Sequence, residues 1–278
     1  QESRGLGDVY KRQTEACMGQ ELSRSIAMAI NLKSLSKPSG QRPIIATIFG
    51  EGGLGKTTLA AMFPKPVFIR TEDGTASLTG NDNVSLFPVA TSTQDVLDAI
   101  ETLGTEKHEF KTLVIDSITQ LATLIESEIV ATDPKAKSIN QAGGGYGAGY
   151  GAASERHRVV REYAGGLAHE AGMNVVFIGH ADTETLDLPD MDPYARYCVR
   201  MHKKSIPHYT DNVDLVGLIR LKTFTRGDGD KKRAISTGER EILCFPQASS
   251  VTKNRFNITE PLSFTFDGGN PFQKFVTE

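Results

Sequence analysis

The chain has 278 residues, of which 38% are hydrophobic and 23% charged, an ordinary composition for a globular protein. No run approaches the ~18 consecutive apolar residues that a membrane span requires, and the three widely spaced cysteines argue against a disulfide framework and for a reducing cytosol. The net charge of −3 excludes a polycation, but residues 196–255 hold 13 basic and 6 acidic side chains, so this segment carries +7 and the rest −10. Such a distribution favours a localised anion-binding surface.

The first 41 residues differ in character from the rest of the sequence. Residues 8–13 (DVYKRQ) look like a translated transposon end, so we expect residues 1–17 to be a non-native or disordered tail and Met18 to be the natural start. Residues 18–41 read as a polar lead-in that closes with Lys37-Pro38-Ser39-Gly40.

From residue 44 onward, short apolar runs alternate with helical patterns. Strands are expected at 44–49, 66–69, 84–89, 112–115 and 174–178, and helices at 56–62, 91–103, 118–129 and 154–171. A glycine-rich loop is expected at 138–152, and strands follow at 213–221, 233–237 and 241–245, with a turn at 237–239. The alternation predicts βαβ units and an α/β fold with a mainly parallel sheet.

Residues 50–57 read GEGGLGKT and match the pattern G-x-x-x-x-G-K-T in full. They follow an expected strand and precede an expected helix, the context in which glycines let backbone N–H groups surround phosphates. Lys56 is then expected to contact the β- and γ-phosphates and Thr57 to bind Mg²⁺. The alternative is a flexible glycine turn with a chance Lys-Thr pair. The predicted nucleotide-binding residues are Gly50, Glu51, Gly52, Gly53, Leu54, Gly55, Lys56, Thr57 and Thr58.

Two carboxylates follow strands that come after this loop. Asp116 ends the apolar run 113–115, where a nucleoside triphosphatase holds the carboxylate that organises its metal ion, on a strand neighbouring the phosphate loop. A helix-capping aspartate is the alternative. Glu72 follows the strand at 66–69 and is a candidate to orient or deprotonate water, because ligands of open α/β sheets lie at the carboxyl ends of strands. Asp73 competes for that role, and a solvated loop acid is the alternative.

Further motifs follow one another along the chain in a distinctive order. They are residues 63–69 (FPKPVFI), 71–74 (TEDG), 110–117 (FKTLVIDS), 147–151 (GAGYG), 172–180 (GMNVVFIGH) and 201–204 (MHKK). Together with residues 50–58 they resemble the RecA-like branch of P-loop ATPases, and more narrowly the phage-borne AAA-domain ATPases that include the Sak-type single-strand annealing recombinases. The likeness runs from about Arg42 to Lys204, and more weakly to Phe256. It implies a RecA-like P-loop NTPase core at 42–225, with helices on both faces of the sheet, and a β-rich C-terminal extension at 226–278.

The resemblance also implies catalytic roles for particular side chains. Glu72 matches the catalytic glutamate of RecA-like enzymes. His180 ends the strand on which these proteins keep a polar residue that senses the γ-phosphate, and a strand-end histidine satisfied by backbone is the alternative. Lys253 and Arg255 resemble the K-x-R finger that reaches the γ-phosphate of a neighbouring subunit, and a solvated basic turn is the alternative.

Two segments are candidates for contact with DNA. In RecA-like folds the loop after the helix that follows the metal-binding aspartate, here Asp116, faces the central channel or filament axis, and Tyr146 and Tyr150 in that loop could stack on bases. A mobile surface loop is the alternative. The segment 181–210 reads as a long functional loop in which Arg200, Lys203 and Lys204 could neutralise DNA phosphates. The same cations could instead serve ATP across a subunit contact, or form a charged solvated surface.

Three functional hypotheses follow. The first is an ATP- and Mg²⁺-dependent phage protein of the bacterial cytoplasm, assembled as a homo-oligomeric ring or filament, that acts on single-stranded DNA in recombination or annealing. A single-strand binding protein is a further candidate partner, and no membrane is involved. The second is a RecA-like motor or helicase-loader ATPase of phage replication. The third is a P-loop ATPase with no role on DNA. The sequence has no N-K-x-D motif, which argues against a GTPase.

Overall fold

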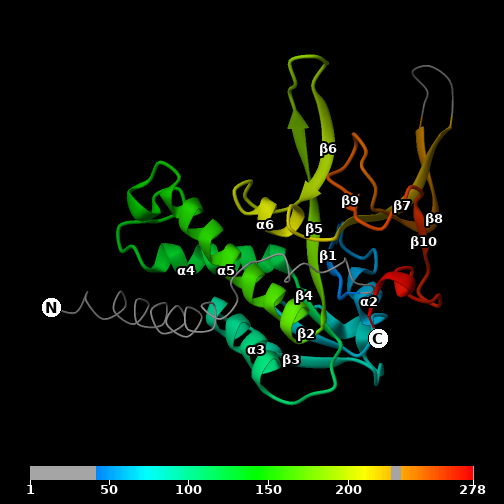
Figure 1. The fold of residues 1–278 in the computed structure, drawn as a ribbon. Coiled ribbons are helices and arrows are strands. Elements are labelled where there is room, and N and C mark those ends of the chain that lie inside the picture. The colour runs from blue at the N-terminus through cyan, green and yellow to red at the C-terminus, as the bar shows by residue number, and fades with distance from the viewer. Residues whose placement is uncertain (1–41, 227–232, 278) are drawn as a thin grey trace, which may run out of the picture. The chain divides into compact units, whose positions relative to one another are not determined.

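The computed structural model describes residues 42–226 and 233–277, so the predictions for residues 1–17 and 18–41 lie outside the described residues. Within them, ten strands form a mixed sheet in the order β10-β8-β7-β1-β5-β4-β2-β3, with β6 paired to β5 and β9 paired to β7 (Figure 1). The strands are β1 (Ile45–Gly50), β2 (Pro66–Arg70), β3 (Ser85–Val89), β4 (Thr112–Asp116), β5 (Asn174–Leu186), β6 (Tyr194–Val199), β7 (Leu215–Arg226), β8 (Arg233–Leu243), β9 (Lys253–Asn254) and β10 (Leu262–Phe264). The six strands from β7 to β3 in this order pair in parallel, which confirms the α/β class with a mostly parallel sheet.

Helices and the C-terminal segment cover the two faces of the sheet. The helices are α2 (Lys56–Ala61), α3 (Thr93–Thr105), α4 (Ile118–Ala131), α5 (Ala148–Glu170) and α6 (Ile206–Thr210). Buried residues of α3, α4 and α5 pack in one core cluster with one set of strand side chains. Buried residues of α2 and of the segment 258–276 pack in a second cluster with the alternate set. Because both faces are covered, the central strands carry nearly continuous apolar runs rather than alternating apolar and polar residues.

The spatial order of the strands differs in one respect from the sequence prediction. All residues of β1 and β4 are buried, as expected for interior parallel strands. We expected the strand that ends in Asp116 to neighbour the strand before the phosphate loop, but β5 lies between β1 and β4. His180 is therefore next to Gly50 in the pairing of β5 with β1. The strand between the two expected site elements itself contributes a side chain to the site.

The segment after residue 178 is not a loop, contrary to the prediction for 181–210. Strand β5 does not end at His180 but continues to Leu186, and it pairs antiparallel with β6 from Ala181↔Val199 to Leu186↔Tyr194. In Figure 1 this ribbon extends away from the main sheet. The outer residues have no core face to bury, so no apolar pattern predicted them. The short helix α6 follows.

Strand β8 also departs from the prediction. The sequence Thr237-Gly238-Glu239 was expected to be a turn between two strands, but β8 is continuous from Arg233 to Leu243. Its register against β7 shifts between Leu221 and Thr223, and Gly238 has a φ of +80°. A glycine at positive φ suits a β-bulge as well as a turn, so the sequence signal did not distinguish them.

The glycine-rich loop is shorter than expected. Helix α5 begins at Ala148 rather than Ser154, with Gly147 at its N-cap, so that four of the five residues of the motif Gly147–Gly151 are helical. Elsewhere the expected helices agree with the structure within a few residues. Ser92 caps α3 in a capping box with Asp95, and Ser117 caps α4 by accepting a hydrogen bond from Gln120 N.

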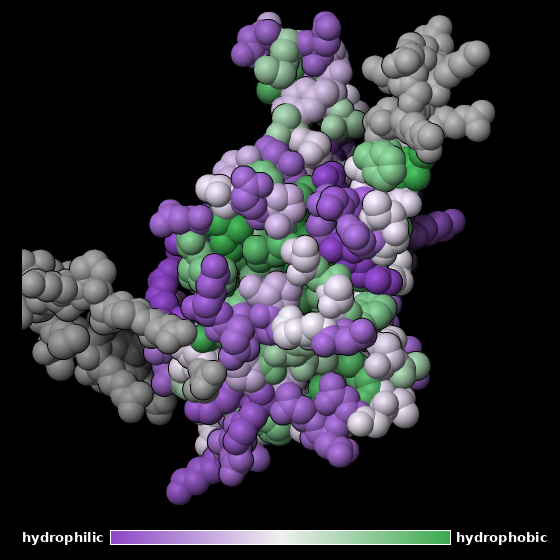
Figure 2. Space-filling view, turned by 90° about the vertical axis from the view of Figure 1, so that its right-hand side faces the viewer, coloured by the Kyte–Doolittle hydropathy of each residue, from purple (hydrophilic) through white to green (hydrophobic). Residues whose placement is uncertain are grey.

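The described residues belong to one compact unit, and the strands after residue 212 extend the same sheet as β1. Figure 2 turns the side that carries β7, β8 and β10 toward the viewer, and hydrophobic residues there lie among hydrophilic ones. Among the described residues, no helix combines the length and the apolar character that crossing a membrane would require.

Candidate functional site

The residues that follow β1 form a loop that ends at the first turn of α2. Gly53 and Gly55 have φ values of +76° and +90°, so both occupy the left-handed region that favours glycine. Gly50 lies in the sheet between His180 of β5 and Ile219 of β7. The loop therefore begins at the carboxyl end of a central parallel strand, where open α/β sheets bind their ligands.

Lys56 opens α2 and turns back into this loop. Its Nζ donates hydrogen bonds to the carbonyl oxygens of Gly50 at 3.0 Å and Glu51 at 2.8 Å. The side chain is buried, and burial lowers the pKa of Lys56 below its usual value of 10.5. The loop thus holds a largely desolvated ammonium group that an incoming anion could contact.

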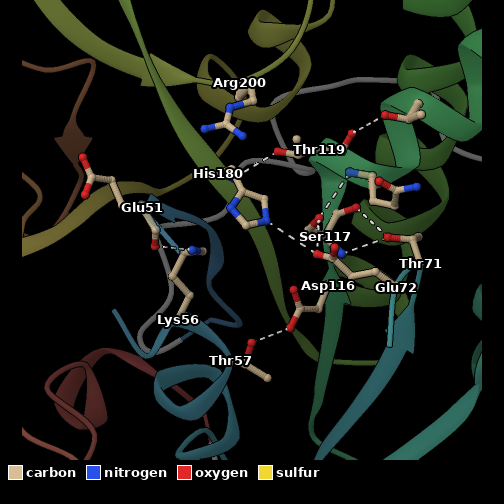
Figure 3. A network of polar contacts seen from close by, with 12 residues as sticks. Glu51, Lys56, Thr57, Thr71, Glu72, Asp116, Ser117, Thr119, His180 and Arg200 are labelled. Carbon is tan, nitrogen blue, oxygen red and sulfur yellow. Dashed lines mark hydrogen bonds and ion pairs between the residues drawn. The ribbon is translucent and has the colours of Figure 1, made fainter. Parts of the chain in front are cut away.

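Thr57 joins the loop to the end of β4. Its Oγ1 donates a hydrogen bond of 2.7 Å to Oδ2 of Asp116 (Figure 3). Asp116 is buried, and this burial raises the pKa of its carboxyl although the bond from Thr57 acts in the opposite direction. The two predicted metal ligands, 59 residues apart in sequence, are therefore in direct contact.

Glu72 lies beside Asp116 because β2 and β4 are adjacent strands. Ser117 Oγ donates a hydrogen bond of 2.9 Å to Oε1 of Glu72, and Thr71 exchanges two hydrogen bonds with the backbone of Ser117. The competitor Asp73 is 85% exposed and pairs with Arg70 at 3.5 Å. Of the two adjacent acids, Glu72 is the one that faces the site (Figure 3).

His180 completes the cluster from β5. Its Nε2 lies 3.6 Å from Oε1 of Glu72, and its backbone N–H donates to Thr119 Oγ1 at 2.9 Å. Arg200, predicted to bind DNA, lies next to it: its backbone N–H donates to His180 O, and its guanidinium donates to Ala181 O at 3.0 Å. The positive charge of Arg200 also helps to lower the pKa of Lys56. Arg200 is therefore a neighbour of the phosphate loop (Figure 3).

These residues fit a magnesium-bound nucleoside triphosphate. The loop supplies backbone N–H groups at positive-φ glycines and a buried ammonium group, which suit phosphate. Thr57 and Asp116 supply hard oxygen ligands, which suit Mg²⁺ and which usually bind it together with phosphate oxygens. Glu72 supplies a carboxylate next to, but separate from, the metal ligands.

Comparison with known proteins agrees with this geometry. A family model described as AAA domain matches residues 42–256. The chain belongs to this family. No curated protein matches the sequence of the chain. Membership of the AAA domain family indicates a nucleotide-binding ATPase, and the matched range contains the phosphate loop, Glu72, Asp116 and His180.

The two residues predicted to act as a finger lie away from this AAA domain site. Lys253 belongs to β9, which pairs with the first residues of β7, and its Nζ donates to Asp211 O at 2.6 Å. Arg255 pairs with Asp214 at 3.1 Å, a carboxylate that also binds Arg42. Because β7 runs parallel to β1, these residues lie toward the amino ends of the strands, whereas the phosphate loop follows the carboxyl end.

The two segments predicted to contact DNA are brought together. The ring of Tyr150, in the first turn of α5, stacks on His202 with centroids 3.7 Å apart and an interplanar angle of 9°. Lys204 Nζ donates to Gly147 O at 3.2 Å. Tyr146 is fully exposed, and Lys203 is exposed beside this cluster. We call Tyr146, Tyr150, His202, Lys203 and Lys204 the tyrosine–lysine cluster.

Sequence reasoning missed several residues of the site. Ser117 Oγ donates a hydrogen bond to Glu72, Thr71 Oγ1 accepts one from the backbone of Ser117, and Thr119 Oγ1 accepts one from the backbone of His180. Serine and threonine at helix starts and strand ends are common as caps, so their presence was no signal. Phe266, which lies beyond the matched range, contacts the phosphate loop at Gly55.

Proposed function

We propose that the protein binds ATP with Mg²⁺ at residues 50–58 and hydrolyses it. The observation that carries this proposal is the 2.7 Å contact between Thr57 Oγ1 and Asp116 Oδ2. These oxygens come from distant segments and meet beside a buried lysine, as binding of a magnesium–triphosphate complex requires. Membership of the AAA domain family supports the same activity.

In this proposal each side chain has a distinct task. Bound Mg²⁺ would supply the positive charge that neutralises the phosphate oxygens. Lys56 adds a second positive charge from the start of α2. Glu72 orients or deprotonates the attacking water, and Ser117 holds its carboxylate through a hydrogen bond of 2.9 Å. His180, whose Nε2 lies 3.6 Å from the Glu72 carboxylate, senses the γ-phosphate from β5, the strand between β1 and β4.

We further propose that the protein acts on single-stranded DNA, in recombination or annealing of the phage type, as a homo-oligomer. The tyrosine–lysine cluster supports this role, because it places the exposed ring of Tyr146 and the half-buried ring of Tyr150, which stacks on His202, beside lysines, and aromatic rings beside cations bind single strands. The charge of +7 over residues 196–255 is also favourable for binding a polyanion. In such an assembly Lys253 and Arg255 would act on the nucleotide of a neighbouring subunit, for which Arg255 would exchange Asp214 for phosphate.

The alternatives differ in what DNA does to turnover. A motor or helicase loader of phage replication would also respond to DNA, but a motor would unwind a forked duplex, whereas an annealing protein would pair complementary strands without unwinding. A P-loop ATPase with no role on DNA would hydrolyse ATP at the same rate with and without DNA. The position of Arg200 beside His180 favours a task at the nucleotide for this residue rather than at DNA.

ATPase turnover, measured with and without single-stranded DNA, tests the proposal when the assembly size is measured in the same samples. We expect turnover that rises with DNA, an assembly larger than one chain, and loss of turnover in Lys56→Ala. Turnover that ignores DNA would refute the DNA role, and turnover that survives Lys56→Ala would refute the assignment of the site.

A further inference from the structure

Two aromatic rings from the C-terminal segment pack against the phosphate loop. A Cβ atom added to Gly55 would overlap the Cε1 edge of the Phe266 ring and would lie 3.1 Å from Cε1 of Phe264. Gly55 immediately precedes Lys56. The chain therefore returns, more than 200 residues after the loop, to place aromatic carbon beside the residue that starts α2.

The two rings have different surroundings. Phe264 is 2% exposed and belongs to the core cluster that includes α2. Phe266 is 46% exposed, and its ring meets that of Phe264 edge to face, with centroids 5.7 Å apart. Phe264 thus anchors the segment, and Phe266 is about half exposed at the margin of the loop.

A third side chain fixes the orientation of the exposed ring. The guanidinium carbon of Arg240, from β8, lies 4.1 Å from the centroid of the Phe266 ring. Its Nε is buried and has no hydrogen-bond partner among the described residues. Contacts with Gly55, Phe264 and Arg240 together hold the ring in place, so a planar ligand that stacks on it does not have to order the side chain first.

From this arrangement we propose that the exposed ring of Phe266 is the platform on which the base of the nucleotide stacks. The inference rests on the proposed binding of a triphosphate at residues 50–58, because only then does a base leave the loop beside Gly55. Stacking uses the face of the base and does not read its edges. The site therefore prefers purines, which have the larger face, over pyrimidines, and discriminates weakly between adenine and guanine.

The sequence contains no tryptophan, which gives this proposal a direct optical test. In a Phe266→Trp variant the single indole would report on the platform. We expect ATP and GTP to quench its fluorescence in a saturable way, and inorganic tripolyphosphate, which has no base, to leave it nearly unchanged. Phe224→Trp is the matched control, because Phe224 is similarly exposed at 49% on β7 and should give no saturable response. Equal quenching by tripolyphosphate, or quenching of the control at the same concentrations, would overturn the proposal.

Binding constants separate this inference from the proposed function. For Phe266→Ala we expect the Kd for ATP to rise on the order of tenfold, about 1.4 kcal/mol, while the Kd for tripolyphosphate stays as in the wild type. Phe266→Tyr, which keeps the ring, should bind ATP like the wild type. The preference of the wild type for ATP over CTP should shrink in Phe266→Ala.

The remaining outcomes of these binding measurements distinguish failure of the Phe266 platform from failure of the proposed triphosphate site. If Phe266→Ala binds ATP as the wild type does, the platform is refuted while the triphosphate site stands. If this variant loses ATP and tripolyphosphate equally, Phe266 supports only the packing of the loop, and the inference is also wrong. If the wild-type protein binds neither compound, or if Lys56→Ala binds both unchanged, the proposed function itself fails.

Discussion

The adjacent acids Glu72 and Asp73 allow a prediction with a built-in control. We expect Glu72→Gln to lower kcat by about 10²–10⁴-fold, the usual contribution of a positioned general base. The amide retains an oxygen that can accept the 2.9 Å hydrogen bond from Ser117, so the side chain should keep its place. The Kd for ATP should therefore remain within about twofold of the wild type, since Glu72 is next to the metal ligands but is not one of them.

The same geometry bounds the effect on stability. The contact between His180 Nε2 and Glu72 Oε1 is long, at 3.6 Å, and the Glu72 side chain is 40% exposed. A pair of this kind contributes at most a few tenths of a kcal/mol after screening by solvent. A change in the free energy of unfolding of more than ~1 kcal/mol would show that the substitution disturbs the fold, and the loss of turnover would then not measure catalysis.

Asp73→Asn is the control, because Asp73 is 85% exposed and pairs with Arg70 rather than with the site. Steady-state phosphate release at saturating ATP gives kcat, and calorimetry with the same samples gives Kd. The reasoning would be wrong if Glu72→Gln turned over within threefold of the wild type, or if Asp73→Asn lost as much activity as Glu72→Gln.

Three further predictions concern the metal site and the tyrosine–lysine cluster. Burial raises the pKa of Asp116 above 3.8 in the folded chain, so the stabilising contribution of its neutral form is present below pH 3.8 and is lost as the pH rises through the raised pKa. Asp116→Asn should therefore raise the Tm of the nucleotide-free protein at pH 7 and lose this advantage near pH 3, while magnesium-dependent ATP binding is abolished; a lowered Tm at pH 7 would contradict this. Tyr146→Ala and Tyr150→Ala should each weaken binding of single-stranded DNA by ~1–3 kcal/mol in a filter or anisotropy assay, whereas Tyr163→Ala, 45% exposed in the middle of α5, should not. Lys203→Glu with Lys204→Glu should reduce the salt dependence of DNA binding by about one unit of slope per lost phosphate contact; loss of ATPase activity with DNA binding intact would instead assign these lysines to the nucleotide.

The parallel core was predictable because its physical signal is local. Residues 45–49 are buried and apolar except for Thr47, and the runs 113–115 in β4 and 175–178 in β5 are buried and apolar throughout. The phosphate loop was predictable because its glycines, lysine and threonine have to stand at fixed spacing. Asp116 followed from its position at the end of an apolar run. In each case a short segment carries the information, whatever the rest of the chain does.

The errors arise where distant contacts decide the local structure. Gly149 was expected in a loop but lies at the start of α5. The carbonyl oxygen of Ile139 occupies the place where a Cβ of residue 149 would be, so close packing requires glycine at this position. The extension of β5 depends on pairing with β6, and nothing in residues 181–186 alone requires it. The charge of its segment made Arg200 a candidate for DNA or for ATP, and that charge could not predict the contact of its backbone N–H with His180 O, which accompanies the pairing of β5 and β6. Phe266 carries no local signal for a position beside Gly55.

The order of the strands explains how these residues form one site. Gly50, His180, Asp116 and Glu72 follow, or lie in, the adjacent strands β1, β5, β4 and β2, so the site crosses four neighbouring strand ends. Thr57 has to reach past β5 to contact Asp116. His180 therefore lies between the loop that would hold phosphate and the carboxylate that would act on water. A shift of the His180 side chain would change its position relative to both the phosphate loop and Glu72. A residue that couples the state of the nucleotide to the ribbon of β5 and β6 has to meet this physical requirement.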